Sequence, residues 1–175
     1  MRAVTGWLAP ILIGLVLVVL LHAFVVQTYS IPSGSMEPTL QVGDRIAVNK
    51  LSYDFHRVHR GDIIVFRRPP AEHCQAGVTF ADLVKRVIGL PGETISSSNG
   101  QVLINGRPLA EPWLPPNDPL GKPIAPITLP PHEYYVLGDN RADSCDSRYW
   151  GPVARNLIVG KVDLRFWPLS RFHLF

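Results

Sequence analysis

The stretch ETISSSNGQVLINGRPL, residues 93–109, has the pattern of short antiparallel strands joined by tight turns. Its two Asn-Gly pairs, at residues 99–100 and 105–106, each interrupt strand-like sequence. Asn-Gly accepts the positive φ angles of a type I′ turn, which commonly links two adjacent antiparallel strands. We therefore expect a small meander here, in a domain that is antiparallel wherever such hairpins occur.

Several further segments have the apolar, alternating or β-branched composition of strands. They are DRIAVNKLSY (44–53), GDIIVF (61–66), DLVKRVIGL (82–90), EYYVLGD (133–139) and LIVGKVDLRFW (157–167). No long segment after the N-terminal region shows a sustained helical period. The expected fold class is therefore mostly β, with an antiparallel β-sheet.

Residues 108–131 differ from this pattern, since they hold nine of the chain's 17 prolines. Proline lacks a backbone N–H and fixes φ, so this density excludes a regular helix and a central strand. We expect an excursion over the surface of the domain, with a wall of a substrate groove as the less favoured alternative.

The N-terminal region has the composition of a membrane anchor. No Asp, Glu, Lys or Arg occurs from Ala3 to Met36, and residues 7–26 are almost entirely apolar. Those 20 residues would form a helix of ~30 Å, the thickness of a bilayer core. A cleavable signal would need a shorter apolar core and a small-x-small site, and a helix in a soluble core rarely has apolar side chains all round.

We therefore expect a short tail at residues 1–6, a transmembrane anchor at 7–26 and an extracytoplasmic, β-rich domain at 27–175. Because the tail is so short, the N-terminus should stay in the cytoplasm while the domain crosses a plasma membrane in a single-pass topology. We expect Met36 and aromatic residues near the C-terminal end, such as Trp167, to contact lipid, with a place in the core as an equal alternative for Trp167.

The charge distribution bounds the partners. The net charge of +3 comes from 17 basic and 14 acidic residues, which are scattered along the chain. Nucleic-acid binding would need a basic patch, so we expect no nucleic acid, and a phospholipid membrane is the partner that a mildly basic domain favours. Cys74 and Cys145 could pair or stay free, and no His/Cys cluster has ligand spacing. We expect no metal and no cofactor.

A candidate nucleophile lies in IPSGSMEPTL, residues 31–40, directly after the apolar run. Pro32 and Pro38 restrict the backbone, while Gly34 allows a sharp turn between Ser33 and Ser35. Such a turn could present one hydroxyl outward, but a serine hydroxyl is a weak nucleophile until a base removes its proton. None of the six histidines is part of a recognisable Ser-His-Asp set.

Lys85 is a candidate base, because it lies among apolar residues in DLVKRVIGL. Strand alternation places Lys85 and Arg86 on opposite faces, so we expect one of them to face the core. Burial of an ammonium group lowers its pKa toward values at which the amine acts as a base, which arginine cannot do.

The segment LGDNRADSCDSRYWG, residues 137–151, interleaves carboxylates with guanidinium groups. This pattern favours ion pairs that brace a loop, and the arginines argue against a metal cage. A hydroxyl in the same segment, Ser144 or Ser147, could orient a lysine amine.

Taken in order behind the apolar run, five segments resemble the conserved boxes of bacterial type I signal peptidases over the whole chain. They are SGSMEPTL, GDRIAVNKLSY, GDIIVF, KRVIGLPGETI and LGDNRADSCDSRYWGPV. The resemblance implies a serine–lysine dyad, in which Ser35 is the nucleophile and Lys85 is the general base. Ala142 departs from the family, which often carries an acid at this position.

The resemblance also implies the supporting residues. The Ser33 hydroxyl and the Ser35 backbone N–H would form the oxyanion hole, and Ser144 would hold the lysine amine. Asp146 and Arg148 would form a structural pair. The residues expected to bind substrate as strand edges are Ile31, Pro32, Asp82, Leu83 and Val84.

The function implied is that of a membrane-bound serine endopeptidase. It would remove signal peptides from secretory precursor proteins after Ala-x-Ala sites. A specialised pilin or conjugation-protein maturation peptidase of the same fold is an alternative, and a non-catalytic anchored β module is a less favoured one. A soluble, self-cleaving repressor-type peptidase would lack the apolar N-terminal run.

Overall fold

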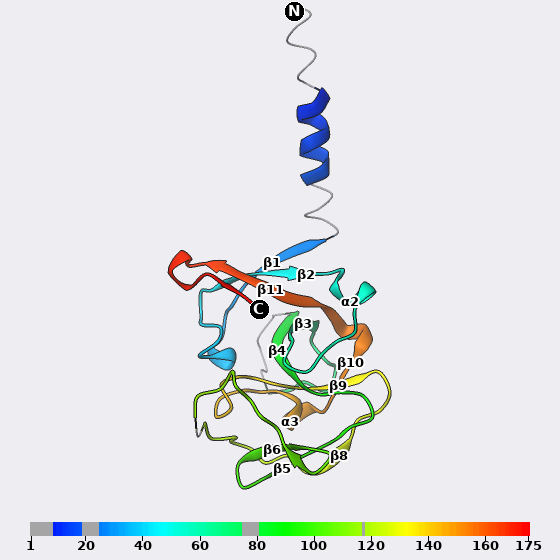
Figure 1. Ribbon diagram of the computed structural model, residues 1–175, viewed down its shortest axis with the longest axis vertical. Helices are drawn as coiled ribbons and strands as arrows, with labels where there is room; N and C mark the ends of the chain where they lie inside the picture. Colours follow the sequence, from blue (N-terminus) through cyan, green and yellow to red (C-terminus); the bar gives the residue numbers. More distant parts are fainter. Residues whose placement is uncertain (1–8, 19–24, 75–80, 117) are drawn as a thin grey trace, which may run out of the picture.

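The computed structural model describes residues 9–18, 25–74, 81–116 and 118–175 (Figure 1). Within these residues, eight strands form one sheet in the order β1-β2-β11-β3-β4-β9-β10, with β12 paired to β11. The strands are β1 (Val26–Ser30), β2 (Arg45–Asn49), β3 (Ile63–Arg67), β4 (Asp82–Gly89), β9 (Glu133–Leu137), β10 (Val153–Ala154), β11 (Ile158–Trp167) and β12 (His173–Leu174).

A second, smaller sheet has the order β7-β6-β5-β8. Its strands are β5 (Thr94–Ser98), β6 (Gln101–Ile104), β7 (Arg107–Pro108) and β8 (Ile127–Thr128). All described strand pairs in both sheets are antiparallel, as the sequence predicted. The meander is confirmed as well, because Asn99 and Asn105 and the glycine after each have positive φ angles between 50° and 76°.

The helical elements of the domain are short. They are η1 (Gly34–Met36), α2 (Ser52–Phe55), α3 (Ser147–Trp150), η2 (Arg155–Leu157) and η3 (Leu169–Arg171). Two of them matter for the site, since η1 carries the candidate nucleophile and α3 follows the loop of alternating charges.

The core is built around β3, whose side chains are buried on both faces. Ile63 and Val65 pack into one apolar cluster with Met36, while Ile64 and Phe66 pack into another with Trp150. Successive strand residues point to opposite faces, so a strand covered on both sides needs an unbroken apolar run. The expectation that Met36 contacts lipid is wrong, because its side chain is only 1% exposed.

The proline-rich segment 108–131 is not only a surface excursion, which corrects the expectation from its composition. Leu120, Ile124 and Leu129 are buried in a third apolar cluster together with residues of β4, β5 and β9. Regular structure in the described part of the segment is limited to β8 and the end of β7, the outer strands of the smaller sheet. Proline excluded the central strands, as expected, but its apolar neighbours still supply core.

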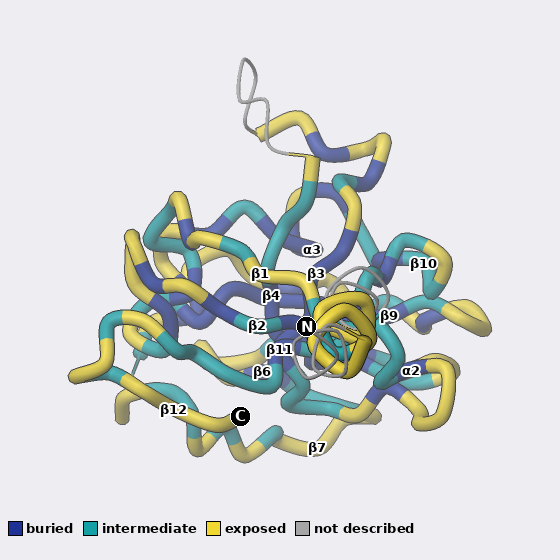
Figure 2. The backbone as a smooth tube through the Cα atoms, turned by 90° about the horizontal axis from the view of Figure 1, so that it is seen from above, coloured by how far each residue is buried: buried dark blue, intermediate teal, exposed yellow. Residues whose placement is uncertain are grey.

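Residues 9–18 form a helix whose large apolar side chains are exposed, from 49% at Val16 to 65% at Ile11 (Figure 2). The expected anchor at 7–26 extends beyond this helix, and its residues 7–8 and 19–24 lie outside the described residues. Val26, which we assigned to the anchor, begins β1. Among the described residues, no helix combines the length and the apolar character that crossing a membrane requires.

Candidate active site

The candidate nucleophile is held in a tight turn. Ser35 lies in η1, directly before the buried side chain of Met36. Asn140 fixes this turn at two points: its side-chain Nδ2 donates to the Gly34 carbonyl and its backbone N–H donates to the Ser35 carbonyl, both at 3.1 Å. The sequence indicated no role for Asn140, because its neighbours in the chain do not reveal a contact with Gly34, 106 positions away.

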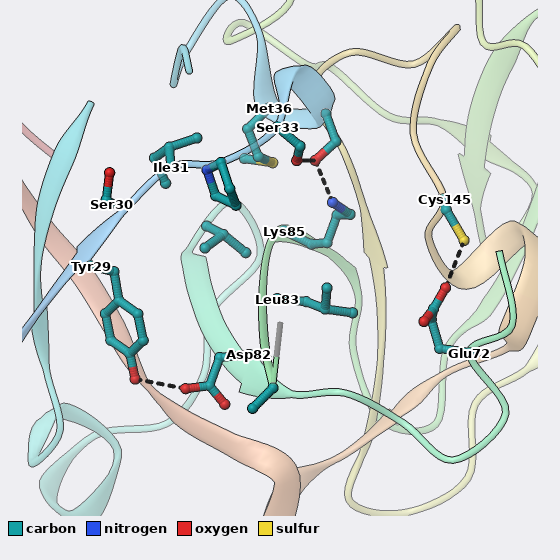
Figure 3. A pocket seen from close by; sticks show the side chains of 14 residues that line it. Tyr29, Ser30, Ile31, Ser33, Met36, Glu72, Asp82, Leu83, Lys85 and Cys145 are labelled. Carbon is teal, nitrogen blue, oxygen red and sulfur yellow. Dashed lines mark hydrogen bonds between the residues drawn. The ribbon is translucent and has the colours of Figure 1, made fainter. Parts of the chain in front are cut away.

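The candidate base reaches Ser35 from β4. Lys85 Nζ lies 2.6 Å from Ser35 Oγ, and the lysine side chain is buried, with 4% of the residue exposed (Figure 3). At this separation a protonated amine donates to the hydroxyl oxygen, whereas a neutral amine has the lone pair to accept the hydroxyl proton. The structure therefore brings together the two residues that the sequence assigned to the dyad.

The environment of Lys85 favours its neutral form. Burial lowers the pKa of the amine from 10.5 to about 8, because the charged form loses hydration. The carboxylates of Asp146, Asp139 and Glu72 act in the opposite direction, while Arg148 lowers the pKa further. Desolvation is the dominant effect, and it leaves a useful fraction of neutral amine near neutral pH.

Arg86, the neighbour of Lys85, is also buried, with 6% exposed. The expectation that only one of the two cations faces the interior is wrong, because β4 is covered on both faces. Arg86 Nε and Nη2 donate to the two carboxylate oxygens of Asp139 at 2.8 and 2.6 Å, and the guanidinium carbon lies 4.8 Å from the centre of the Trp113 ring.

The loop of alternating charges is braced by a buried ion pair between Asp146 and Arg148. Arg148 Nη2 donates to Asp146 Oδ2 at 2.7 Å, and the same carboxylate oxygen accepts from the Gly138 N–H at 3.0 Å. Arg148 also donates to the carbonyl oxygens of Arg141 and Ser144, at 2.8 and 3.3 Å. The two residues thus hold the loop in a fixed shape beside the dyad.

Two further serines were expected in the site. Ser33 Oγ lies 3.5 Å from Ser35 Oγ, at the limit of a hydrogen bond. Ser144 Oγ is buried and has no hydrogen-bond partner among the described residues. A Cβ at Gly138 would collide with the Ser144 side chain and with the Ser35 carbonyl, so glycine permits both to approach. Among the described residues, no hydrogen bond joins Ser144 to Lys85. The expected role of Ser144 in holding the lysine amine stays a prediction.

A cavity of about 240 Å³ opens beside the dyad. Its walls include all the residues expected to bind substrate, namely Ile31, Pro32, Asp82, Leu83 and Val84. At the far end, the Tyr29 hydroxyl donates to Asp82 Oδ2 at 3.0 Å, although three strands separate β1 from β4 in the sheet order (Figure 3). The sheet therefore curls until β1 and the start of β4 face each other across the cavity.

The strand segment that faces the cavity has a free edge. Residues 82–85 of β4 pair with β3, but pairing of β4 with β9 begins only at Arg86. Among the described residues, the other edge of 82–85 is thus open toward the cavity. An extended peptide can form main-chain hydrogen bonds with such an edge.

Cys74 and Cys145 form a disulfide, with 6.1 Å between their Cα atoms, which answers the question that the sequence left open. The Glu72 carboxylate lies 3.5 Å from Cys145 Sγ. These three residues are close enough together to hold an ion, but the disulfide leaves no thiolates for a metal.

Comparisons with known proteins agree with this architecture. The model of the family "Signal peptidase, peptidase S26" matches residues 4–167. Signal peptidase I of Leptolyngbya laminosa is 45% identical over 161 residues, which cover 91% of this chain and 77% of the relative. Signal peptidase I of Bacillus caldolyticus is 41% identical over 175 residues, which cover 93% of this chain and 91% of the relative.

The fold has a counterpart among solved structures. The crystal structure of a signal peptidase I from Enterococcus faecalis is 31% identical, with a TM-score of 0.50, and the match covers 61% of this chain and 97% of that one. The sequence and structural matches thus point to one family. The chain belongs to the signal peptidase family, peptidase S26, and is an enzyme of that type.

Proposed function

We propose that this protein is a membrane-bound serine endopeptidase that removes N-terminal signal peptides from secreted precursors, with Ser35 as nucleophile and Lys85 as general base. The observation that carries the proposal is the 2.6 Å separation between Ser35 Oγ and a buried lysine amine. The names of the relatives, signal peptidase I, support the reaction class.

The first chemical step uses the neutral amine. Lys85 Nζ takes the proton of Ser35 Oγ as the oxygen attacks the carbonyl carbon of the scissile peptide bond. The resulting oxyanion accepts hydrogen bonds from the Ser35 N–H and the Ser33 hydroxyl, and each such donor contributes about 3 kcal/mol in comparable hydrolases.

Proton return completes the cycle. Protonated Lys85 donates its proton to the leaving amine when the C–N bond breaks, and the mature chain departs with a new N-terminus. A water molecule, deprotonated by the same lysine, then hydrolyses the acyl ester on Ser35. Asp146 and Arg148 support these steps by fixing the loop that packs against the dyad, and Ser144 is the hydroxyl proposed to orient the amine.

The substrate would bind as an extended strand between residues 31–32 and the open edge of 82–84. Alternate side chains of such a strand point to the same side, so the first and third residues before the cut enter the same cavity. Apolar walls from Ile31, Leu83 and Val84 and a volume of about 240 Å³ favour small residues there. This supports cleavage after small-x-small sites such as Ala-x-Ala.

The setting that we propose is the plasma membrane, with residues 7–26 as a single-pass anchor. The N-terminus would be cytoplasmic and residues 27–175 extracytoplasmic. The exposed apolar side chains of the helix at 9–18 support this, because water disfavours an uncovered apolar helix. Trp167, at 50% exposed, stays a proposed lipid contact.

The test is cleavage of a secretory precursor by the full chain in non-ionic detergent. We expect wild type to release the mature protein, and Ser35→Ala and Lys85→Arg to lose roughly 10³-fold or more of kcat/KM while remaining folded. Ser98→Ala, an exposed serine of the β5–β6 hairpin, is the matched control and should keep full activity. A non-catalytic module predicts no cleavage by any of the four proteins.

A specialised maturation peptidase would have the same dyad but a narrower set of substrates. A panel of precursor sites separates the two functions. Cleavage of unrelated secretory precursors after small-x-small sites supports the general enzyme, and cleavage of pilin-type precursors alone supports the specialised one.

A further inference from the structure

A second cavity also borders the nucleophile, and none of the residues expected to bind substrate lines it. It is lined by Ser33, Gly34, Ser35, Cys74, Ala142, Asp143, Ser144, Cys145 and Tyr149. Of these, Ser33, Ser35 and Cys145 also line the first cavity. A peptide whose scissile carbonyl lies at Ser35 has to continue past the nucleophile, and this second cavity is the space that it would enter.

A carboxylate, that of Asp143, stands at the wall of the second cavity. Asp143 is exposed, and its carboxylate has no ion-pair partner among the described residues. Its backbone N–H donates to the carbonyl of Asn140 at 3.1 Å, and Arg148 binds carbonyl oxygens on both sides of it, at Arg141 and Ser144. The carboxylate is therefore carried on a backbone whose position is fixed.

Another lining residue of the second cavity, Tyr149, has a cation over its ring, although that cation, Lys122, does not line the cavity itself. Tyr149 is 55% exposed, and Lys122 Nζ lies 4.3 Å from the centre of its ring. The backbone around residue 121 lies against residues 141–142, since a Cβ at Gly121 would be 2.7 Å from the Arg141 carbonyl and 3.5 Å from Ala142 Cα. Lys122 thus stands near the same loop and reduces the negative potential that Asp143 creates.

We propose that this second cavity binds the first residues after the scissile bond, and that Asp143 makes it favour a cationic over an acidic side chain there. The inference rests on the proposed function, since it takes Ser35 as the point of cleavage. It assigns to Asp143 a role in specificity and none in bond breaking. One exposed carboxylate attracts a cation and repels an anion, and each effect changes the binding free energy only modestly. We therefore expect kcat/KM for a peptide with Lys after the cut to be about fivefold higher than for the same peptide with Glu.

The experiment compares three pairs of otherwise identical peptides with an Ala-x-Ala site. One pair is used for each of the first, second and third positions after the cut. Within a pair, one peptide carries Lys at that position and the other carries Glu. For full-length wild type in non-ionic detergent, we expect a Lys-to-Glu ratio of kcat/KM of about five at one of these positions in low salt. The ratio should approach one in 1 M salt, where the screening length is only about 3 Å.

Charge variants assign the preference to one residue. Asp143→Asn should bring the ratio close to one, Asp143→Lys should invert it, and Lys122→Gln should increase it. Asp54→Asn is the matched control, because Asp54 is an exposed acid on α2 outside both cavities. It should leave the wild-type ratio unchanged.

The Lys-to-Glu preference is also measured as the ratio of the binding affinities of the two uncleaved peptides for the Ser35→Ala protein. Cleavage of all peptides without discrimination, or a ratio that survives Asp143→Asn, overturns the inference and leaves the proposed function intact. Failure of wild type to cleave any peptide contradicts the proposed function instead, and the binding ratio on Ser35→Ala protein then still decides the role of Asp143.

Discussion

Arg86, the residue after the candidate base Lys85, forms a buried, bidentate ion pair with Asp139. Both guanidinium–carboxylate hydrogen bonds are shorter than 2.9 Å, and Asp139 also accepts from the Thr39 hydroxyl. Since Arg86 follows Lys85 in β4, this pair fixes the strand at the point where Lys85 turns toward Ser35. The ion pair therefore links the stability of the strand to the geometry of the site.

Replacement of Arg86 by Lys should destabilise the fold. Lysine keeps the charge but cannot make two parallel hydrogen bonds to Asp139, so that a buried carboxylate loses part of its compensation. We expect the free energy of unfolding to fall by about 2 kcal/mol. Denaturant unfolding measures this, with Arg107→Lys on the exposed β7 as control; an unchanged midpoint for Arg86→Lys would show that the pair contributes nothing.

Asn140 should act as a positioning residue for the nucleophile. Its side chain holds the Gly34 carbonyl, next to Ser35, so Asn140→Ala frees one side of the turn. We expect kcat to fall about tenfold, the equivalent of one hydrogen bond, with KM nearly constant. The control is Asn156→Ala, an exposed residue of η2. A change in KM alone would point to substrate binding instead of positioning.

The disulfide between Cys74 and Cys145 should stabilise the domain. It closes a loop of 71 residues, which in the chain-entropy model corresponds to about 4 kcal/mol. We expect Cys74→Ser and reduced wild type to unfold at the same, lower denaturant concentration. Unfolded, unreduced wild type should show no reactive thiol, and two reactive thiols in that state would mean that the pair does not form.

Lys85 should reduce the stability of the protein while it enables catalysis. Below pH 8 both the folded and the unfolded lysine are protonated, and the folded state carries the full cost of a buried charge. Between pH 8 and 10.5 the folded protein releases its proton first, so the unfolded state binds more protons and stability rises with pH. The shift corresponds to about 3 kcal/mol.

Lys85→Met removes this cost together with the activity. At pH 7 we expect the variant to be about 3 kcal/mol more stable than wild type, with the difference narrowing toward pH 10. Unfolding of both proteins in parallel across this pH range cancels the contributions of other groups. A variant that is less stable at pH 7, with a difference independent of pH, would contradict the assignment of a costly buried amine.

Local patterns predicted the sheet but not how its layers cover one another. The Asn-Gly turns were found because the signal lies in two adjacent residues with a defined backbone preference. The burial of Arg86 was missed because alternation along β4 separates its two faces but says nothing about what packs on each. The same holds for Leu120, Ile124 and Leu129, whose burial depends on a sheet formed elsewhere in the chain.

For the site, the residue types indicated chemistry while the positions came from the resemblance. A serine in a tight turn and a lysine in an apolar strand are each common, and only tertiary structure brings Ser35 and Lys85 into contact across 50 positions. Asn140 and the cysteine pairing were beyond reach for the same reason, since their partners are far apart in the sequence. Asp143 lies within the segment 137–151, but the sequence indicated no function for it, because the cavity it lines exists only in the folded chain.

The central claim, that a neutral Lys85 takes the proton of Ser35, is tested most directly by the pH dependence of kcat/KM for a model precursor. Because this ratio reports the pKa of essential groups in the free enzyme, we predict a tenfold rise per pH unit below about pH 8 and a plateau above it. Lys85→Arg should be inactive throughout. A wild-type profile that is flat from pH 6 to 9, or a Lys85→Arg protein with the wild-type profile, would contradict the account.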